Sequence, residues 1–204
     1  MGPPSLTHVF FDIGGVLATN GWDREQRARG RERFGLDEAF EYRHQEVVGE
    51  LETGAIDFDE YLDITVFQEP RPFSREAMRA FILSLSEPFP ASIALARRVA
   101  EAGRVTLMTL NNESEALNLH RIERFGLRDI FSAFLSSCWL RLHKPSVRYF
   151  ERALDISQAD PARALFIDDR EHNLAPARAL GFHTLHYTDA AALEAALTGA
   201  NVLP

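Results

Sequence analysis

The chain has 204 residues, of which 46% are hydrophobic and 25% are charged, and it carries a formal net charge of -8. This length allows one domain, or one domain with an insert, around a sizeable buried core. The negative charge disfavours nucleic acid and anionic membranes as main partners. It allows a small anionic substrate, because a local cation overrules the overall field within about 8 Å.

The first element that the sequence predicts is a buried strand at His8–Asp12, an apolar run that ends in a carboxylate. Residues 21–88 follow without a clear strand. Four helical patterns fill this stretch, at Asp23–Phe34, Asp37–Leu51, Asp57–Phe67 and Ser74–Leu85. An all-helical block after the first strand is typical of an insert. We therefore expect a helical cap at residues 21–88 over a core domain made of residues 1–20 and 89–204.

Strands and helices alternate in the rest of the chain. Two clear apolar runs and two weaker ones predict strands, at Arg104–Leu110, Ala164–Asp168, Phe131–Leu135 and His183–Tyr187. Helical patterns lie at Ala91–Ala102, Glu113–Phe125, Val147–Leu154 and Leu174–Leu180. Buried strands that alternate with helices predict an α/β fold, here a Rossmann-like parallel sheet core with helices on both faces and the inserted all-helical cap.

Carboxylates stand where two of these strands end, and ligands of open parallel sheets bind beyond the carboxyl ends of the strands. Asp12 is followed by Gly14 and Gly15, a pattern that fits either a simple turn or a nucleophile on a tight loop. Asp168 and Asp169 end a later strand, where capping of a helix is their alternative role. Three carboxylates at one sheet edge need a compensating cation, and Mg²⁺ suits such oxygen ligands.

Other strand ends supply candidate phosphate contacts. Asn111 and Asn112 follow a strand, and they either donate to an anion or cap the next helix. Lys144 is a candidate partner for a phosphoryl oxygen and for Asp12. We expect Pro145, which follows this lysine, to be the first residue of a helix.

Together these segments resemble a known family. FFDIGGVL, LNN, LHKP and FIDDREHN occur in the order and approximate spacing of the four motifs of the haloacid dehalogenase-like superfamily, and the insert resembles its helical cap. The likeness covers nearly the whole chain, and the motifs are specific jointly rather than singly. Gly14, together with the DDxxxN pattern that ends at Asn173, is most similar to bacterial sugar-phosphate phosphatases, including glucose-1-phosphatases.

The resemblance implies an enzyme that hydrolyses a small phosphorylated metabolite with Mg²⁺ as cofactor. Asp12 would be the nucleophile that becomes an aspartyl-phosphate, and Lys144 would orient it. The implied metal ligands are Asp12, the Gly14 carbonyl and Asp169, with Asp168 as a further ligand or linked through water. The remaining candidates are Asn173 as support for this loop, Asn111, Asn112 and Gly15 as substrate contacts, and Asn20 and Trp22 at the pocket mouth, where core packing explains Trp22 equally well.

Two positions depart from the family pattern. Phosphatases of this superfamily commonly carry an acid–base Asp at the position of Gly14, a role typically worth about 10² to 10⁴ in rate. Its absence favours a substrate with a good leaving group, such as a glycosyl or acyl phosphate, or an acid supplied by the substrate, water or the cap. Asn111 stands in the usual Ser/Thr position, which Thr109 fills if the register shifts.

Two other functions remain open on the sequence. A metal-free 2-haloacid dehalogenase would use the same Asp12, but an attack on carbon gains nothing from the anions of Asp168 and Asp169. A catalytically silent phosphate-binding domain agrees with Gly14 and Asn111. The retained Asp12, Lys144 and Asp169 argue against it. We therefore favour the phosphatase.

The sequence also bears on the cellular setting. Its one cysteine, Cys138, excludes an internal disulfide and favours a reducing cytoplasm, and a buried inert thiol is more common than a reactive one. Met1–Thr7 lacks the pattern of a signal peptide, and no apolar run approaches the ~18 residues of a membrane helix. We expect a cytoplasmic protein without a membrane partner, and the oligomeric state stays open.

Overall fold

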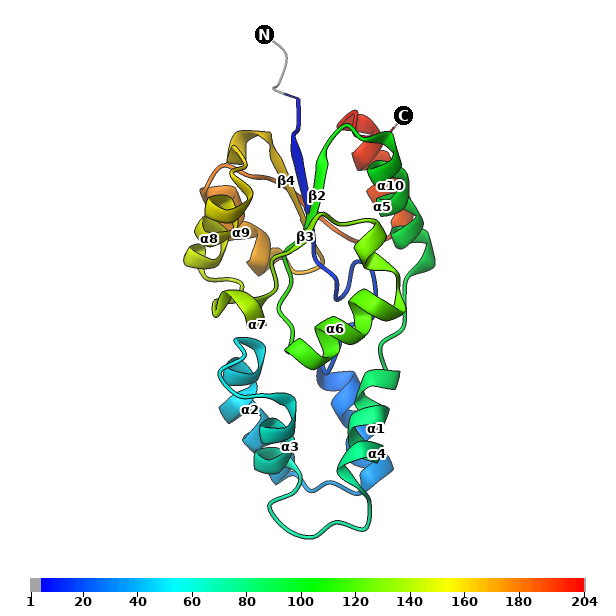
Figure 1. The fold of residues 1–204 in the computed structure, drawn as a ribbon, viewed down its shortest axis with the longest axis vertical. Helices are drawn as coiled ribbons and strands as arrows, with labels where there is room; N and C mark the ends of the chain where they lie inside the picture. The colour runs from blue at the N-terminus through cyan, green and yellow to red at the C-terminus, as the bar shows by residue number, and fades with distance from the viewer. Residues whose placement is uncertain (1–4, 204) are drawn as a thin grey trace.

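The computed structural model describes residues 5–203, and its centre is one sheet of five parallel strands in the order β3-β2-β1-β4-β5 (Figure 1). The strands are β1 (His8–Phe11), β2 (Thr106–Thr109), β3 (Ala133–Phe134), β4 (Ala164–Asp168) and β5 (His183–His186). Each lies within an apolar run that predicts it, so the parallel sheet is confirmed. Most of Met1–Thr7, for which no signal peptide is expected, lies outside the described residues.

Strand β1 occupies the middle of the sheet because its side chains are apolar on both faces, and Phe10 and Phe11 are fully buried. It pairs in register with both neighbours, so that Phe11 stands opposite Thr109 of β2 and Ile167 of β4. The residues that follow these strands therefore emerge side by side at one edge. The N–H of Asp12 donates to the Ile167 carbonyl at 2.9 Å, which keeps Asp12 beside the end of β4.

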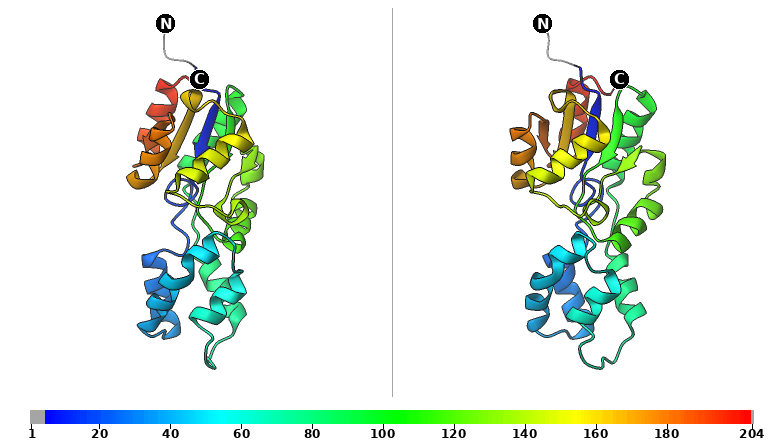
Figure 2. Two further views of the ribbon diagram at one scale, coloured as in Figure 1. Left: turned by 90° about the vertical axis from the view of Figure 1, so that its left-hand side faces the viewer. Right: turned by 60° about the vertical axis from the view of Figure 1, so that its left-hand side comes forward.

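Helices cover both faces of this sheet, in agreement with the sequence (Figures 1 and 2). Helices α5 (Pro90–Ala102) and α10 (Ala190–Gly199) pack on one face, and α8 (Val147–Ser157) and α9 (Glu171–Ala179) pack on the other. The connections contain α6 (Glu115–Arg124), the short α7 (Ser137–Leu140) and the 3-10 turns Leu127–Asp129 and Pro161–Arg163. None of the helices within residues 5–203 combines the length and apolar character that crossing a membrane requires.

The helix that follows Lys144 begins later than the sequence predicts. Helix α8 starts at Val147, and Ser146 in extended conformation is its N-cap, so the prediction that Pro145 opens the helix is wrong. The amide of Asn112 explains the delay, because its Oδ1 accepts from the Lys144 N–H at 2.8 Å and its Nδ2 donates to the Lys144 carbonyl at 2.9 Å. These bonds hold the backbone before Pro145 in a loop.

Residues 21–88 place four helices beyond the carboxyl ends of the strands (Figure 2). They are α1 (Arg24–Phe34), α2 (Ala39–Glu52), α3 (Phe58–Thr65) and α4 (Arg75–Ser84), and they occupy the four predicted places. Three of them begin at side-chain caps, because Asp23, Asp57 and Ser74 each accept from a backbone N–H of the first turn. This cap has its own apolar core, which includes Phe40 and Met78. Its boundaries at residues 21 and 88 stay a prediction.

The chain enters and leaves the cap along two adjacent segments. The Thr19 N–H donates to the Glu87 carbonyl at 2.8 Å, and the Phe89 N–H donates to the Leu17 carbonyl at 2.7 Å. Ala18 also forms an antiparallel bridge with Pro88. Because both connections are short and paired, they orient the cap over the ends of the strands.

Candidate active site

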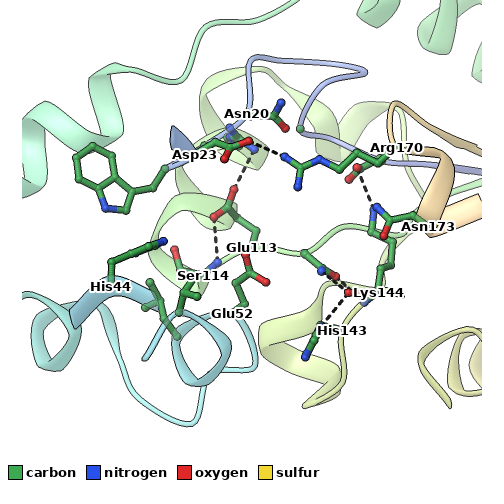
Figure 3. Close-up of a pocket in the computed structure, with 18 of the residues that line it drawn as sticks. Asn20, Asp23, His44, Glu52, Glu113, Ser114, His143, Lys144, Arg170 and Asn173 are labelled. Atoms are coloured by element: carbon green, nitrogen blue, oxygen red, sulfur yellow. Dashed lines mark hydrogen bonds and ion pairs between the residues drawn. The ribbon is translucent and has the colours of Figure 1, made fainter. Parts of the chain in front are cut away.

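A cavity of about 430 Å³ lies between the cap and the carboxyl ends of the strands (Figure 3). Asp12, Lys144 and Asn173 line it from the core, and His44 and Phe58 line it from the cap. Open α/β sheets bind their ligands at this edge, and the volume suits a small metabolite. The cavity therefore joins the motif residues of the core to a wall that the cap supplies.

The ammonium of Lys144 lies between two carboxylates at this edge of the sheet. Its Nζ is 2.9 Å from Asp12 Oδ2 and 2.7 Å from Asp168 Oδ2, and it donates to the Leu110 carbonyl at 2.9 Å. All three charged side chains are buried. A buried ammonium with this many acceptors is held firmly, because loss of any partner leaves a charge uncompensated. The fold thus brings together residues from three distant parts of the sequence.

Both carboxylate oxygens of Asp168 are occupied by protein donors. Its Oδ1 accepts from the Arg170 N–H at 2.8 Å, its Oδ2 accepts from Lys144, and the Asn173 amide donates to both oxygens at 3.1 Å. Asp168 is also fully buried. These contacts suit a residue that fixes Lys144 and the loop after β4, and Asn173 supports that loop directly.

The carboxylate of Asp169 has different surroundings. Its Oδ1 is buried, and it has no hydrogen-bond partner among residues 5–203. One oxygen each of Asp12, Asp168 and Asp169 lie within 4.8 Å of one another. An unpartnered buried oxygen beside two more carboxylates is costly unless a cation binds there. Oxygen donors of this kind suit Mg²⁺, so the donor set fits the ion that the sequence leads us to expect.

Burial and mutual repulsion perturb the titration of this cluster. Burial raises the pKa of Asp12 above its ordinary range; Lys144 opposes this effect, and Asp168 adds to it. Burial and the charge of Asp168 also raise the pKa of Asp169. Burial disfavours the Lys144 ammonium, but Asp12 and Asp168 overcome that effect and raise the pKa of the lysine. A divalent cation favours the ionised carboxylates, which is the form a nucleophile needs.

The two glycines after Asp12 lie close to other site residues. Gly15 has a φ of 74°, and its backbone lies against the carboxylate of Asp169. Gly14 and Asn20 both line the cavity. A Cβ on Gly14 would lie 3.0 Å from Asn20 Oδ1 and 3.6 Å from Arg121 Nη1, so a side chain at this position would contact Asn20 and lie near Arg121.

The two asparagines after β2 differ in where their side chains lie. Asn112 lines the cavity and binds both backbone groups of Lys144. Asn111 is almost fully buried and does not line the cavity: its Nδ2 donates to Asn118 at 3.0 Å, and its Oδ1 accepts from the Thr109 hydroxyl at 3.3 Å. Of these residues, Asn112 is therefore the one that adjoins the space where a ligand would bind.

The cap wall of the cavity contains a chain of hydrogen-bonded aromatic side chains. Trp22 Nε1 donates to the Tyr61 hydroxyl at 2.8 Å, and that hydroxyl lies 2.9 Å from His44 Nδ1. Because Tyr61 is fully buried, its own proton goes to His44 Nδ1, which leaves the proton of His44 on Nε2. Burial, assisted by the charge of Arg27, lowers the pKa of His44 to about 4, so its ring is neutral at pH 7. Trp22 packs in the cap core and also lines the cavity.

Several charged residues of this site were not identified from the sequence. Glu52 and Glu113 line the cavity (Figure 3). Arg121 lines it as well, and its Nη1 lies 3.0 Å from Glu113 Oε2. Arg170, from the loop after β4, pairs with Asp23 of the cap at 2.6 Å. One signal was available for Glu113, because it directly follows Asn111 and Asn112 beyond the end of a predicted strand, where ligands of parallel sheets bind.

Comparison with known proteins identifies related chains. A family model described as haloacid dehalogenase-like hydrolase matches residues 6–181. Bifunctional epoxide hydrolase 2 from Sus scrofa is 27% identical, and the match covers 91% of this chain and 37% of that protein. A phosphoglycolate phosphatase from Mesorhizobium japonicum is 30% identical over 47% of this chain and 42% of its own length. The chain thus spans less than two thirds of the length of these curated relatives.

A solved structure shares the whole architecture. A haloacid dehalogenase-family enzyme from Bacteroides thetaiotaomicron, in complex with magnesium and inorganic phosphate, superimposes with a TM-score of 0.80 at 21% identity. The match covers 90% of this chain and 95% of that one. At this identity the likeness establishes a common fold, in which the sheet and the cap are both included.

Proposed function

The chain belongs to the haloacid dehalogenase-like hydrolases, and from this premise we propose that it hydrolyses a small phosphate ester in a Mg²⁺-dependent reaction. Asp12 is the proposed nucleophile. The observation that carries the proposal is the arrangement around Lys144, whose ammonium contacts Asp12 and Asp168 while an unpartnered oxygen of Asp169 lies beside them. A site that gathers cations around a carboxylate suits transfer of an anionic phosphoryl group. A phosphoglycolate phosphatase among the relatives supports the same chemistry.

The magnesium ion would be held by Asp12, Asp169 and the carbonyl of Gly14. When bound, it neutralises negative charge on the phosphoryl group. Asp168 would reach it through water, because its oxygens are already taken by protein donors. The ion would supply a partner for Oδ1 of Asp169, which is buried without a hydrogen bond from residues 5–203.

The remaining groups orient the reaction. One oxygen of Asp12 forms a bond to phosphorus and gives an aspartyl-phosphate, while Lys144 fixes Asp12 and balances the charge of the transferring group. Asn112 holds the backbone of Lys144, and Asn173 holds Asp168. Further proposed substrate contacts come from Asn20 and Trp22, which line the cavity, and from the backbone of Gly15 and Asn111, whose neighbours Gly14 and Asn112 line it.

The proposed reaction raises the question of what protonates the oxygen of the leaving group. Because Gly14 carries no side chain, it provides no acid at the position where related phosphatases commonly have Asp. A good leaving group, such as that of a sugar 1-phosphate, removes the need for an acid. Alternatively, an acid located elsewhere in the cavity supplies the proton that position 14 does not.

The pair Asp168–Asp169 distinguishes this proposal from a 2-haloacid dehalogenase. A carboxylate that attacks carbon gains nothing from two further anions, whereas a magnesium site needs them. The free, buried Cys138 agrees with a reducing compartment, and we propose the cytoplasm as the setting.

Hydrolysis of 4-nitrophenyl phosphate tests the proposal. We expect turnover with Mg²⁺ that EDTA abolishes, and a loss of about 10³-fold or more in Asp12→Asn. The matched control is Asp155→Asn, an identical change at an exposed position of α8, which should keep full activity. Chloride release from 2-chloropropionate without metal would instead indicate the dehalogenase. Neither activity would indicate a phosphate-binding domain without catalysis.

A panel of sugar phosphates then tests the leaving group. If no acid acts in the cavity, sugar 1-phosphates should be hydrolysed faster than sugar 6-phosphates, because the anomeric oxygen leaves more easily. Equal rates would show that the enzyme supplies a proton itself.

A further inference from the structure

Glu113 places a carboxyl group in the cavity that none of these roles explains. It follows the end of β2, and its side chain lines the cavity together with Lys144 (Figure 3). Asp12 lines the same cavity. Its Oε1 accepts from the Ser114 N–H at 3.0 Å, and its Oε2 accepts from Arg121 Nη1 at 3.0 Å. The residue is 9% exposed, so the carboxyl is buried but retains an opening to the cavity.

The partners of Glu113 are themselves fixed. Arg121 is 1% exposed, its Nε donates to the Ser86 hydroxyl at 2.7 Å, and its Nη2 donates to the Thr19 carbonyl at 2.6 Å. A Cβ on Gly21 would lie 2.6 Å from Glu113 Oε2, so the backbone at the entrance of the cap packs against the carboxyl. Glu113 is therefore held between a rigid guanidinium and the cap entrance.

Position 14 lies near the guanidinium of Arg121 as well. A Cβ on Gly14 would lie 3.6 Å from Arg121 Nη1, and that nitrogen is the one that binds Glu113. A carboxyl group at position 14, as related phosphatases carry it, would therefore reach toward the guanidinium that already holds Glu113. The structure has a carboxyl in this region of the cavity, supplied by the loop after β2 rather than by the loop after β1.

We propose that Glu113 is the general acid and base of the reaction, in place of the carboxyl group missing at Gly14. The inference rests on the proposed function, because it supplies the proton that a phosphatase built on Asp12 needs. Arg121 is then the positioning residue, since it orients the Glu113 carboxyl and is itself held by Ser86 and Thr19.

The surroundings of Glu113 suit this role. Burial raises its pKa to about 7; Arg121 opposes the rise, and the nearby Glu52 adds to it. The titratable groups that face it are Arg121 on α6, Glu52 at the end of α2 and the Cys138 thiol on α7. A carboxyl group that is partly protonated near neutral pH can both give and take a proton.

Two proton transfers complete the cycle. In the first step, Asp12 bonds to phosphorus, the bond from phosphorus to the ester oxygen breaks with its electron pair on that oxygen, and protonated Glu113 gives its proton to it. The alcohol then leaves. In the second step, the Glu113 carboxylate takes a proton from water while the water oxygen bonds to phosphorus and the Asp12–phosphorus bond breaks. Asp12 returns as a carboxylate, Glu113 is protonated again, and inorganic phosphate is released.

The leaving group distinguishes an acid from a residue that is merely structural. Phenyl phosphate and 4-nitrophenyl phosphate are similar in shape, but the phenolate of the former is the more basic leaving group and depends more on an acid. We expect Glu113→Gln to lower kcat/KM by about 10²-fold or more for phenyl phosphate, and by less than about tenfold for 4-nitrophenyl phosphate. Equal losses for both esters would overturn the proposal. Addition of Gly14→Asp to Glu113→Gln should restore part of the rate on phenyl phosphate.

A measurement on the unaltered protein covers the case in which Glu113→Gln does not fold. Above pH 7, kcat/KM for phenyl phosphate should fall relative to that for 4-nitrophenyl phosphate, because the acid loses its proton. A ratio that stays constant from pH 6 to pH 9 would overturn the role of Glu113. Absence of Mg²⁺-dependent hydrolysis of either ester would instead refute the proposed function itself.

Discussion

The backbone of Gly15 lies directly against the carboxylate of Asp169. A Cβ on Gly15 would lie 2.2 Å from the Asp169 carboxyl carbon, and the φ of Gly15 is 74°. Position 15 therefore requires glycine for two reasons: its backbone is left-handed, and the Asp169 side chain lies where a Cβ would be. Because Asp169 has an unpartnered oxygen at the candidate metal site, Gly15 determines where that oxygen lies.

We predict that Gly15→Ala weakens Mg²⁺ binding by about 10- to 100-fold, because the new methyl group displaces Asp169. The matched control is Gly35→Ala, since Gly35 has a φ of 62° and no atom within 4 Å of the added Cβ. Both changes should lower the free energy of unfolding by about 1–2 kcal/mol through the left-handed backbone alone. Titration calorimetry with Mg²⁺ separates the two, and equal affinities in both variants would contradict the argument.

Magnesium should also stabilise the folded chain. An ion that binds only the folded state at 100 times its Kd adds about 2.7 kcal/mol to the free energy of unfolding. We predict that Asp169→Asn abolishes this gain, while Asp155→Asn, at an exposed position, keeps it. Thermal unfolding with and without Mg²⁺ measures the difference. An equal rise in Tm for Asp169→Asn would show that the ion binds elsewhere.

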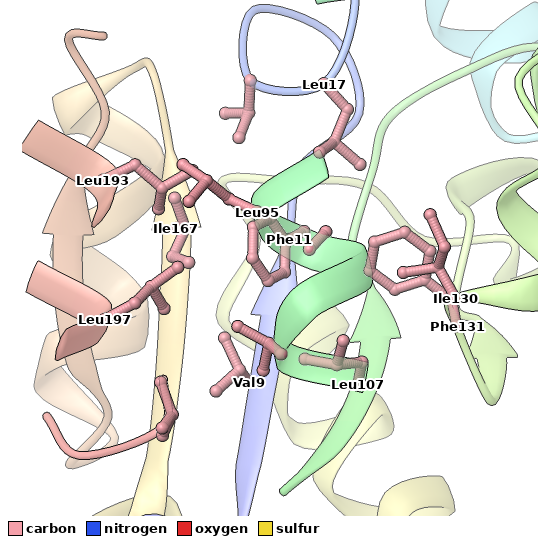
Figure 4. Close-up of a cluster of buried hydrophobic side chains, with 14 of the residues drawn as sticks. Val9, Phe11, Leu17, Leu95, Leu107, Ile130, Phe131, Ile167, Leu193 and Leu197 are labelled. Atoms are coloured by element: carbon pink, nitrogen blue, oxygen red, sulfur yellow. The ribbon is translucent and has the colours of Figure 1, made fainter. Parts of the chain in front are cut away.

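The central strands β1 and β4 were predictable because they are buried on both faces, which produces short apolar runs with abrupt ends. The edge strands β3 and β5 are only partly buried, and their runs are weaker. Helix α10 was not identified. Its sequence is rich in alanine and has little polar contrast between its faces, although Leu193 and Leu197 pack against the cluster that contains Ile167 (Figure 4). Helix α7 is too short to produce a period. A helix is therefore missed when its faces differ too little in polarity, as in α10, or when it is too short to show a period, as in α7.

Within the site, predictability follows the position of each residue in the fold. Asp12 and Asp168 stand at strand ends, and parallel strands bring their ends to one edge. The contributions of His44 and Glu113 depend on how the cap and the loop after β2 turn toward the cavity. That orientation depends on packing between distant segments, which has no periodic trace in the sequence. For the same reason, the sequence does not reveal that the side chain of Asn111 is buried away from the cavity.

Cys138 should be inert in the folded protein. Burial raises the pKa of its thiol to about 12, and the charges of Glu113 and Glu115 add to the rise. The thiolate is the reactive form, so little of it is present near neutral pH. We predict no measurable reaction with a disulfide reagent at pH 8 in the native state and complete reaction in denaturant. Rapid stoichiometric labelling of the native protein would contradict this prediction.

His44 should make the stability of the chain depend on pH. Its ordinary pKa is 6.5, and burial together with the charge of Arg27 lowers the pKa to about 4 in the folded protein. Between these values the unfolded chain binds a proton that the folded chain does not bind. The contribution of His44 to stability is therefore complete above pH 6.5 and is lost as the pH falls toward 4.

The size of this loss can be measured by comparison with His44→Gln, in which the titrating group is absent. Between pH 7.5 and pH 5.5, the unaltered chain should lose about 1.4 kcal/mol more of its unfolding free energy than the variant, since each pH unit below the unfolded pKa contributes about that amount. The other titrating groups are common to both proteins and cancel in the difference. Denaturant unfolding at the two pH values provides the measurement. Parallel losses in both proteins would mean that His44 binds a proton in the folded state, and its Nδ1 would then no longer accept the hydrogen bond from Tyr61.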